Sequence, residues 1–279
     1  MIGLILQIVR LATPYLFAAA GGTVAEQSGI VSLGLEGYML AGACAAAFGS
    51  YYGGSVWSGV LCGAMGGAVL AAIHGIATIR FRADQIVSGI AINILAVGTT
   101  RFALRVAFGS SSNSPRVPGG ASGLLEIAGL LSIFAVSAVI DRTRFGLRLR
   151  AAGEHPEAAT SVGISVSRVR AVAVVASGIL AGLGGTFLAL DQHQFSDEMT
   201  AGRGFIALAA VIFGRWQPLR VGAACLLFAA AEALEINLQG TSAIPSQFVA
   251  MIPYVLTIVA LAGIVGRSVP PAALGKSGH

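Results

Sequence analysis

The chain of 279 residues is 56% hydrophobic and only 10% charged. Soluble domains carry about 25% charged residues, so this composition excludes an ordinary soluble protein and indicates an integral membrane protein. The net charge of +5 comes from arginines, since Lys276 is the only lysine. Arginines in cytoplasmic loops account for that charge, and no nucleic-acid partner is expected.

Apolar segments recur along the chain, and most approach the roughly 20 residues that a helix needs to cross a bilayer. The predicted spans are 4–20, 30–50, 56–79, 85–107, 123–140, 171–190, 204–213, 219–238 and 248–265. The expected fold class is therefore all-α, a polytopic membrane bundle of about eight to nine transmembrane helices. We expect one transmembrane domain, 1–279, with a cytoplasmic loop at 141–170.

The segment 204–213 is too short to cross a bilayer by itself. It is either a re-entrant half helix or a crossing completed by its flanking residues. If 141–170 is cytoplasmic and every segment crosses, most basic residues fall in cytoplasmic loops. The positive-inside rule then predicts an N-terminus outside and a C-terminus inside.

Small residues at every fourth position predict close helix packing in two of the spans, because lipid gives helices no hydrophobic reason to associate. The stripes consist of Gly59, Gly63, Gly67, Ala71 and Gly75 in the third span and of Gly178, Gly182 and Thr186 in the sixth.

Two polar side chains fall deep inside predicted spans. Glu36 lies between Gly34 and Gly37, and a carboxylate at membrane depth costs about 3 kcal/mol unless it is paired or wetted. It either lines a polar path or pins a break in the helix by accepting hydrogen bonds from backbone amides. Asn93 either lines the same path or ties two helices together. Both residues are candidates for a translocation path.

The polar segment 141–170 contains signals for a short helix. Pro156 suits a first helical position, Glu157 complements the positive end of the helix dipole, and Gly163 can end the helix. The sequence predicts a helix at 156–162, which at about two turns is marginal alone in water. We expect it to dock on a partner, because 30 residues are more than a plain linker requires.

No group of residues indicates an enzyme. The histidines are scattered, and no set of nucleophile, base and acid falls together, so neither a catalytic residue nor a metal site is predicted. The Gly275-Lys276-Ser277 run lacks the glycine that a P-loop would have at the position of Pro270. We expect no bound cofactor. An ion-coupled secondary transporter would need several carboxylates at the membrane midplane, for which Glu36 alone is thin support.

Several runs of the sequence resemble one family. GEHPEAATSVGISVSRVRAVAVVASGILAGLGGTFLAL is similar to the cytoplasmic coupling segment and following helix of ABC importer permeases of the ribose and branched-chain amino acid type. SLGLEGYMLAGA resembles the NIGLEGMMLxGA signature of the nucleoside-importing branch, whose binding proteins are of the basic membrane lipoprotein kind, with Ser32 at the place of the usual Asn. TPYLFAAAGGTVAEQSGIVSLGLEG, QIVSGIAINILAVG and GRGFIALAAVIFGRWQP also match that branch.

The resemblance implies a permease subunit of an importer in the bacterial plasma (inner) membrane. Its expected partners are two cytoplasmic ATPase subunits or a fused tandem ATPase, a second and different permease chain, and an extracytoplasmic substrate-binding protein; the ATPases bind the ATP. Nucleosides are the expected substrates, with simple sugars or branched-chain amino acids as alternatives. The residues to which the resemblance assigns ATPase coupling are Gly153, Glu154, Pro156, Ala158, Ala159 and Gly163.

Overall fold

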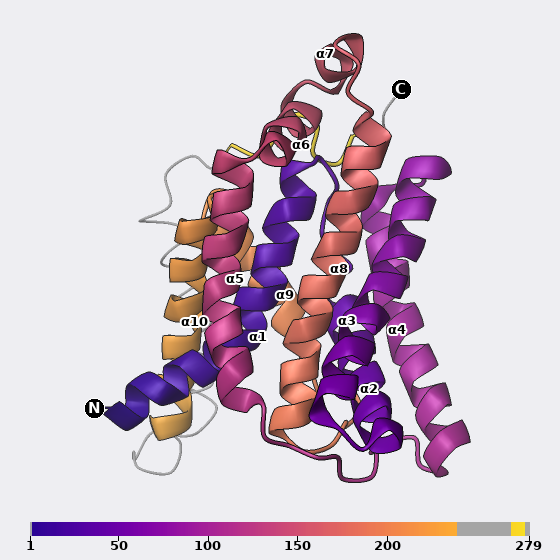
Figure 1. Ribbon diagram of the computed structural model, residues 1–279, viewed down its shortest axis with the longest axis vertical. Coiled ribbons are helices and arrows are strands. Elements are labelled where there is room, and N and C mark those ends of the chain that lie inside the picture. The colour runs from indigo at the N-terminus through magenta and orange to yellow at the C-terminus, as the bar shows by residue number, and fades with distance from the viewer. Residues whose placement is uncertain (1, 239–268, 277–279) are drawn as a thin grey trace.

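The computed structural model describes residues 2–238 and 269–276 (Figure 1). The helices are α1 (Ile2–Gln27), α2 (Leu35–Gly53), α3 (Val56–Gly75), the π-helical turn η1 (Ile76–Arg80), α4 (Gln85–Phe108), α5 (Ser122–Arg142), α6 (Arg144–Glu154), α7 (Pro156–Ser161), α8 (Val166–Asp191), α9 (Arg203–Phe213) and α10 (Pro218–Leu238). Within the described ranges the only strand-like pairing is an isolated bridge between Asn113 and Ser196.

Six of these helices are long and apolar enough to cross a membrane, namely α1, α3 with η1, α4, α5, α8 and α10. This confirms an all-helical protein that spans the membrane several times. The other predicted spans in the described part of the chain correspond to α2 and to the short helix α9. The predicted span 248–265 lies outside the described residues.

The small-residue stripes meet at the centre of the bundle, where α8 packs against α1, α2 and α3. A Cβ atom added to Gly42 would lie 2.5 Å from the backbone of Gly182, and one added to Gly67 would collide with the carbonyl oxygen of Gly178. These helices therefore touch backbone to backbone, as the spacing of small residues predicts.

The first crossing is longer than predicted, and the second begins later. Helix α1 continues to Gln27, at the end of the bundle that carries α6 and α7, called the α7 end below (Figure 1). Residues 28–34 then run back into the bundle without forming a helix, and α2 begins only at Leu35. The prediction of a helix from residue 30 was wrong. Neighbouring side chains bind the backbone of this segment, so it does not need the hydrogen bonds of a helix.

The segment 192–213 also combines irregular chain with a short helix. Helix α8 ends at Asp191, which pairs with Arg10 near the start of α1 (2.7 Å), whereas α10 begins at the α7 end beside α6. The chain from 192 to 213 therefore passes along the bundle, and only its second half, α9, is helical. Of the two alternatives for 204–213, this course along the bundle favours the crossing completed by flanking residues.

The segment 141–170 is mostly helical. The predicted short helix is present as α7, with Val162 as its C-cap. Helix α6 was not predicted, because its arginines made the segment read as a polar loop. The Thr143 side chain accepts a hydrogen bond from the amide of Gly146 (3.1 Å) and caps α6. The helix buries one face, formed by Gly146, Leu149, Ala152 and Gly153.

Candidate functional site

Helix α7 projects beyond the bundle and is joined to it through α6 and α8 (Figure 1). Of the residues assigned to coupling, Glu154, Ala158 and Gly163 are exposed and Pro156 is half-buried. Gly153 and Ala159 are buried. The exposed residues can therefore touch a partner protein directly, whereas the buried pair can act only by holding α6 and α7 in place.

The predicted helix 156–162 ends in a large exposed apolar side chain. The Val162 side chain is 74% exposed at the end of α7. Because α7 projects beyond the bundle, the Val162 side chain is accessible to a partner protein. Val162 is the last residue of the predicted helix and the C-cap of α7.

The base of α6 and α7 is held by the C-terminal segment 269–276. The Gly153 carbonyl oxygen accepts a hydrogen bond from the amide of Ala273 (2.8 Å), and the Glu154 carboxylate accepts one from the amide of Ala272 (3.3 Å). A Cβ atom at position 153 would collide with the Gln27 carbonyl oxygen, so glycine allows α6 to touch the end of α1. Helix α6, which precedes α7 by one residue, therefore packs directly against the end of α1.

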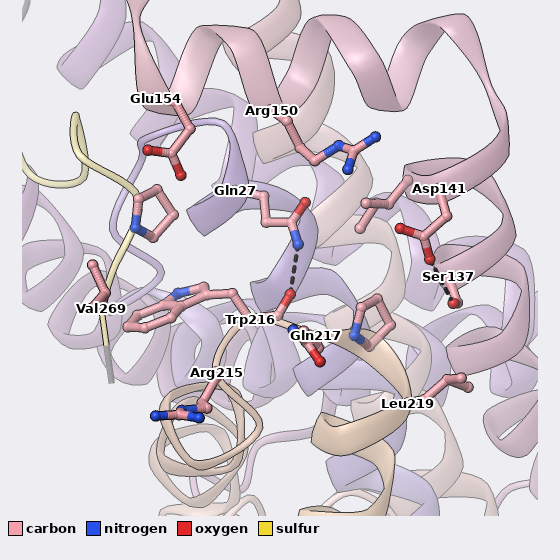
Figure 2. A pocket seen from close by; sticks show the side chains of 13 residues that line it. Gln27, Ser137, Asp141, Arg150, Glu154, Arg215, Trp216, Gln217, Leu219 and Val269 are labelled. Atoms are coloured by element: carbon pink, nitrogen blue, oxygen red, sulfur yellow. Dashed lines mark hydrogen bonds between the residues drawn. The ribbon is translucent and has the colours of Figure 1, made fainter. Parts of the chain in front are cut away.

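A cavity of about 440 Å³ opens beside α6, between the end of α5 and the turn that joins α9 to α10 (Figure 2). Asp141, Arg150 and Glu154 line it together with Trp216, whose carbonyl oxygen accepts a hydrogen bond from Gln27 Nε2 (2.5 Å). Charged side chains of both signs therefore line this cavity. Its lining contains no arrangement of nucleophile, base and acid.

Glu36 joins the first turns of two helices inside the bundle. It lies in the first turn of α2, and its carboxylate accepts hydrogen bonds from the amides of Gly202 (2.8 Å) and Gly204 (2.6 Å) at the start of α9. The first amides of a helix have no partner within the helix, and a negative charge is favourable at that end. A Cβ atom at Gly204 would lie 2.5 Å from the Glu36 amide nitrogen.

Asn93 holds the same region from α4. Its Oδ1 accepts a hydrogen bond from the amide of Gly37 (2.8 Å), and its Nδ2 donates one to the carbonyl oxygen of Leu33 (2.9 Å). Asn93 is about 12 Å along α4 from Gln85 at 1.5 Å per residue, so this contact is well inside the bundle. The structure thus brings both path candidates, Glu36 and Asn93, to the start of α2. We call this group the joint, formed by Glu36, Gly37, Asn93, Gly202 and Gly204.

A charged network lies next to the joint. Arg203, the first residue of α9, pairs with Glu232 of α10 (3.0 Å), and each side chain is 21% exposed. Tyr15 of α1 donates a hydrogen bond to the other carboxylate oxygen of Glu232 (2.6 Å). The network ties α9 to two spanning helices. Sequence reasoning missed Arg203, because its partner is 29 residues away on another helix.

Comparisons with known proteins agree with this architecture. Residues 4–261 match the family described as "Branched-chain amino acid transport system / permease component". The guanosine ABC transporter permease protein NupQ of Bacillus subtilis is 38% identical, over 95% of this chain and 92% of its own length. The nucleoside ABC transporter permease protein NupC of Lactococcus lactis is also 38% identical, over 94% of this chain and 92% of its own length.

The fold also resembles a solved structure, described as an inward-facing conformation of a metal-chelate type ABC transporter. The TM-score is 0.55 at 14% identity, and the match covers 92% of this chain and 84% of the other. This likeness concerns the fold alone. The family match spans most of the sequence, and the chain belongs to the branched-chain amino acid transport system permease family, the membrane-spanning transport subunits of ABC transporters.

Proposed function

We propose that this chain is the permease of a nucleoside importer in a bacterial plasma membrane. The observation that carries the proposal is the 38% identity to NupQ and NupC over almost the whole of each chain. The SLGLEGYMLAGA run adds support, because it forms the start of α2 and includes two residues of the joint.

Glu36 and Asn93 shape the translocation path by positioning its walls. Their polar atoms bind backbone groups at the starts of α2 and α9. A substrate path through a membrane protein is commonly built where helices are broken, because irregular backbone is tolerated there only against protein or a water-filled cavity.

Helix α7 docks on a cytoplasmic ATPase, and a second copy of this coupling arrangement comes from a different permease chain. The proposal of two different permeases is supported by a second permease of Bacillus subtilis, the guanosine ABC transporter permease protein NupP, which is 24% identical to this chain. An extracytoplasmic binding protein delivers the substrate to the opposite end. The arginines of α6 support a cytoplasmic α7 end, an N-terminus outside and a C-terminus inside.

The proposal is tested by reconstituting the chain with its ATPases, second permease and binding protein in proteoliposomes. Uptake of radiolabelled guanosine, uridine, glucose and leucine is measured with ATP supplied on the ATPase side. The proposal expects saturable uptake of at least one nucleoside and none of glucose or leucine. Uptake of glucose or leucine without a nucleoside would overturn the substrate assignment.

A further inference from the structure

The non-helical segment 28–34 runs from the α7 end to the joint. It leaves α1 beside Gly153, at the base of the docking element, and enters α2 immediately before Glu36. It is therefore the shortest stretch of chain between the two functional regions of the proposed transporter.

The start of α8 binds the segment where it leaves α1. The Arg170 side chain is buried, and its Nε donates a hydrogen bond to the carbonyl oxygen of Ser28 (3.1 Å). Gly29 follows with a φ of 93°, and a Cβ atom there would lie 3.0 Å from Arg170 Nη2 and 3.3 Å from the Ala273 carbonyl oxygen. Only residues 162–165 separate α7 from α8, and Arg170 lies in the second turn of α8. A tilt of α7 that shifts the start of α8 would therefore also shift Arg170.

The middle of the segment is bound from two sides. The buried carboxylate of Glu26 accepts hydrogen bonds from the amide of Ser32 (3.2 Å) and from the indole of Trp216 (2.6 Å). On the other side, Gln85 Oε1 accepts a hydrogen bond from the amide of Val31 (2.8 Å). The segment is thus bound by α1 and α4, and Glu26 also links α1 to the α9–α10 turn.

The end of the segment next to α2 is bound by the joint, since Asn93 Nδ2 donates a hydrogen bond to the carbonyl oxygen of Leu33 (2.9 Å). Side chains of other elements thus bind the backbone of the segment at both ends and in the middle. A contiguous set of hydrogen bonds therefore extends from Arg170 at Ser28 to Asn93 at Leu33, next to the first turn of α2.

We propose that segment 28–34 is the mechanical link between the ATPase-docking helix and the joint, and that Arg170 and Gln85 are its positioning residues. This inference rests on the proposed function, because it takes α7 as the docking helix. Coupling through a contiguous set of packed and hydrogen-bonded groups requires direct evidence of coupling, which the following experiment provides.

Arg170→Lys keeps the positive charge but places a methylene group where Nε donates to Ser28. The matched control is Arg168→Lys, an exposed position two residues earlier. Both variants are assembled into the complete transporter in proteoliposomes, and guanosine uptake and ATP hydrolysis are measured together. We expect both variants to retain their ATPases and to hydrolyse ATP at the wild-type rate. Uptake per ATP falls about tenfold in Arg170→Lys alone, as loss of a hydrogen bond from a charged donor would produce.

Gln85→Leu removes the acceptor for Val31 and tests the link at a second place. If both residues act through one link, the Arg170→Lys/Gln85→Leu double variant loses little more than the worse single variant, whereas independent effects multiply. Uptake per ATP equal to that of Arg168→Lys in both single variants, or multiplying losses, would overturn the inference. If Arg170→Lys does not assemble, Gln85→Leu decides by the same readout. Failure of the proposed function is distinct, since the wild-type complex would then show no ATP-dependent nucleoside uptake.

Discussion

At the scale of single residues, the Glu36 carboxylate links the starts of α2 and α9 by hydrogen bonds. We call these two hydrogen bonds the Glu36 clamp. Glu36 lies in a region where an isolated charge is costly, and the Gly202 and Gly204 amides are the partners that offset that cost. Both amides belong to the start of a helix and would otherwise be unpaired. The carboxylate and the two amides therefore satisfy each other's hydrogen-bonding capacity.

Glu36→Gln should destabilise the protein and reduce transport. The neutral amide side chain has only one acceptor atom, so one of the two glycine amides loses its partner at a cost of about 1–3 kcal/mol. Thermal unfolding in detergent measures the loss, with Glu157→Gln on exposed α7 as the control. An unfolding temperature for Glu36→Gln equal to that of the control would show that the clamp contributes nothing to stability.

Gly204→Ala tests the α9 side of the Glu36 clamp. The added Cβ atom would lie 2.5 Å from the Glu36 amide nitrogen, so the backbone must move apart. We expect a clear loss of stability and of uptake, about 1–3 kcal/mol for an overpacked site. Gly98→Ala is the control, because no heavy atom lies within 4 Å of its added Cβ atom and alanine favours a helix by about 1 kcal/mol. Equal behaviour of the two variants would contradict the close approach of α2 and α9.

At the scale of elements, α6 decides how α7 is presented. Leu149 of α6 is completely buried against the bundle, whereas Leu147 two residues earlier is 64% exposed. The helix therefore lies along the end of the bundle with one face packed, and α7 follows after a single residue, His155. A short helix such as α7 needs this support, because it is marginal alone.

Leu149→Ala should loosen α6 and weaken ATPase binding. Removing a buried leucine costs about 2–5 kcal/mol, whereas Leu147→Ala removes an exposed side chain and should change little. Co-purification of the ATPase with each variant measures the effect. Loss of the ATPase in both variants would indicate that Leu147 contacts the partner directly and that α6 is not merely a support.

Val162→Ser should weaken ATPase binding without changing the fold. Burying a valine contributes about 1.5 kcal/mol, so the dissociation constant should rise about tenfold. Val106→Ser is the control, since Val106 is 70% exposed in the last turn of α4, outside the docking helix and the cavity. An unchanged dissociation constant for Val162→Ser would remove Val162 from the docking surface.

At the scale of the whole molecule, the two ends of the bundle carry different elements. The α7 end carries α6, the cavity and the C-terminal segment, and the opposite end carries the start of α1 and the end of α8 (Figure 1). The joint lies between them. This separation matches a transporter in which ATP acts at one end and substrate enters at the other, with alternating access controlled in between.

Cysteine labelling tests which end faces the cytoplasm. Ser161→Cys on α7 should react with a membrane-impermeant maleimide only after the cells are opened, and Ser111→Cys in the exposed connection after α4 should react in intact cells. The unmodified chain measures the background from its own cysteines, Cys44, Cys62 and Cys225. Labelling of Ser161→Cys in intact cells would show that the α7 end faces outside and would contradict the proposed orientation.

Features that depend on neighbouring residues could be predicted from the sequence. The long apolar helices, the close packing of the stripes that contain Gly67 and Gly178, and the short helix that starts at Pro156 were expected from local composition and spacing. Helix α6 could also have been found, because Gly146, Leu149 and Ala152 recur at helical spacing after the capping Thr143.

The joint could not be predicted beyond its two candidate residues. Glu36 and Gly204 are 168 residues apart in sequence, and nothing near Glu36 shows that its partners are backbone amides of another helix. The non-helical course of 28–34 has the same origin, since Gln85 and Asn93 bind it from α4. Long-range hydrogen bonds overrode the local apolar pattern, which alone favours a helix.

The most direct test of the account is whether ATP drives uptake through this permease. Guanosine uptake into proteoliposomes is compared between the complete complex with ATP, the same complex with a non-hydrolysable ATP analogue, and the permeases alone with an imposed proton or sodium gradient. The account predicts accumulation only with hydrolysable ATP and the ATPases present. Accumulation driven by an ion gradient in the absence of the ATPases would contradict it.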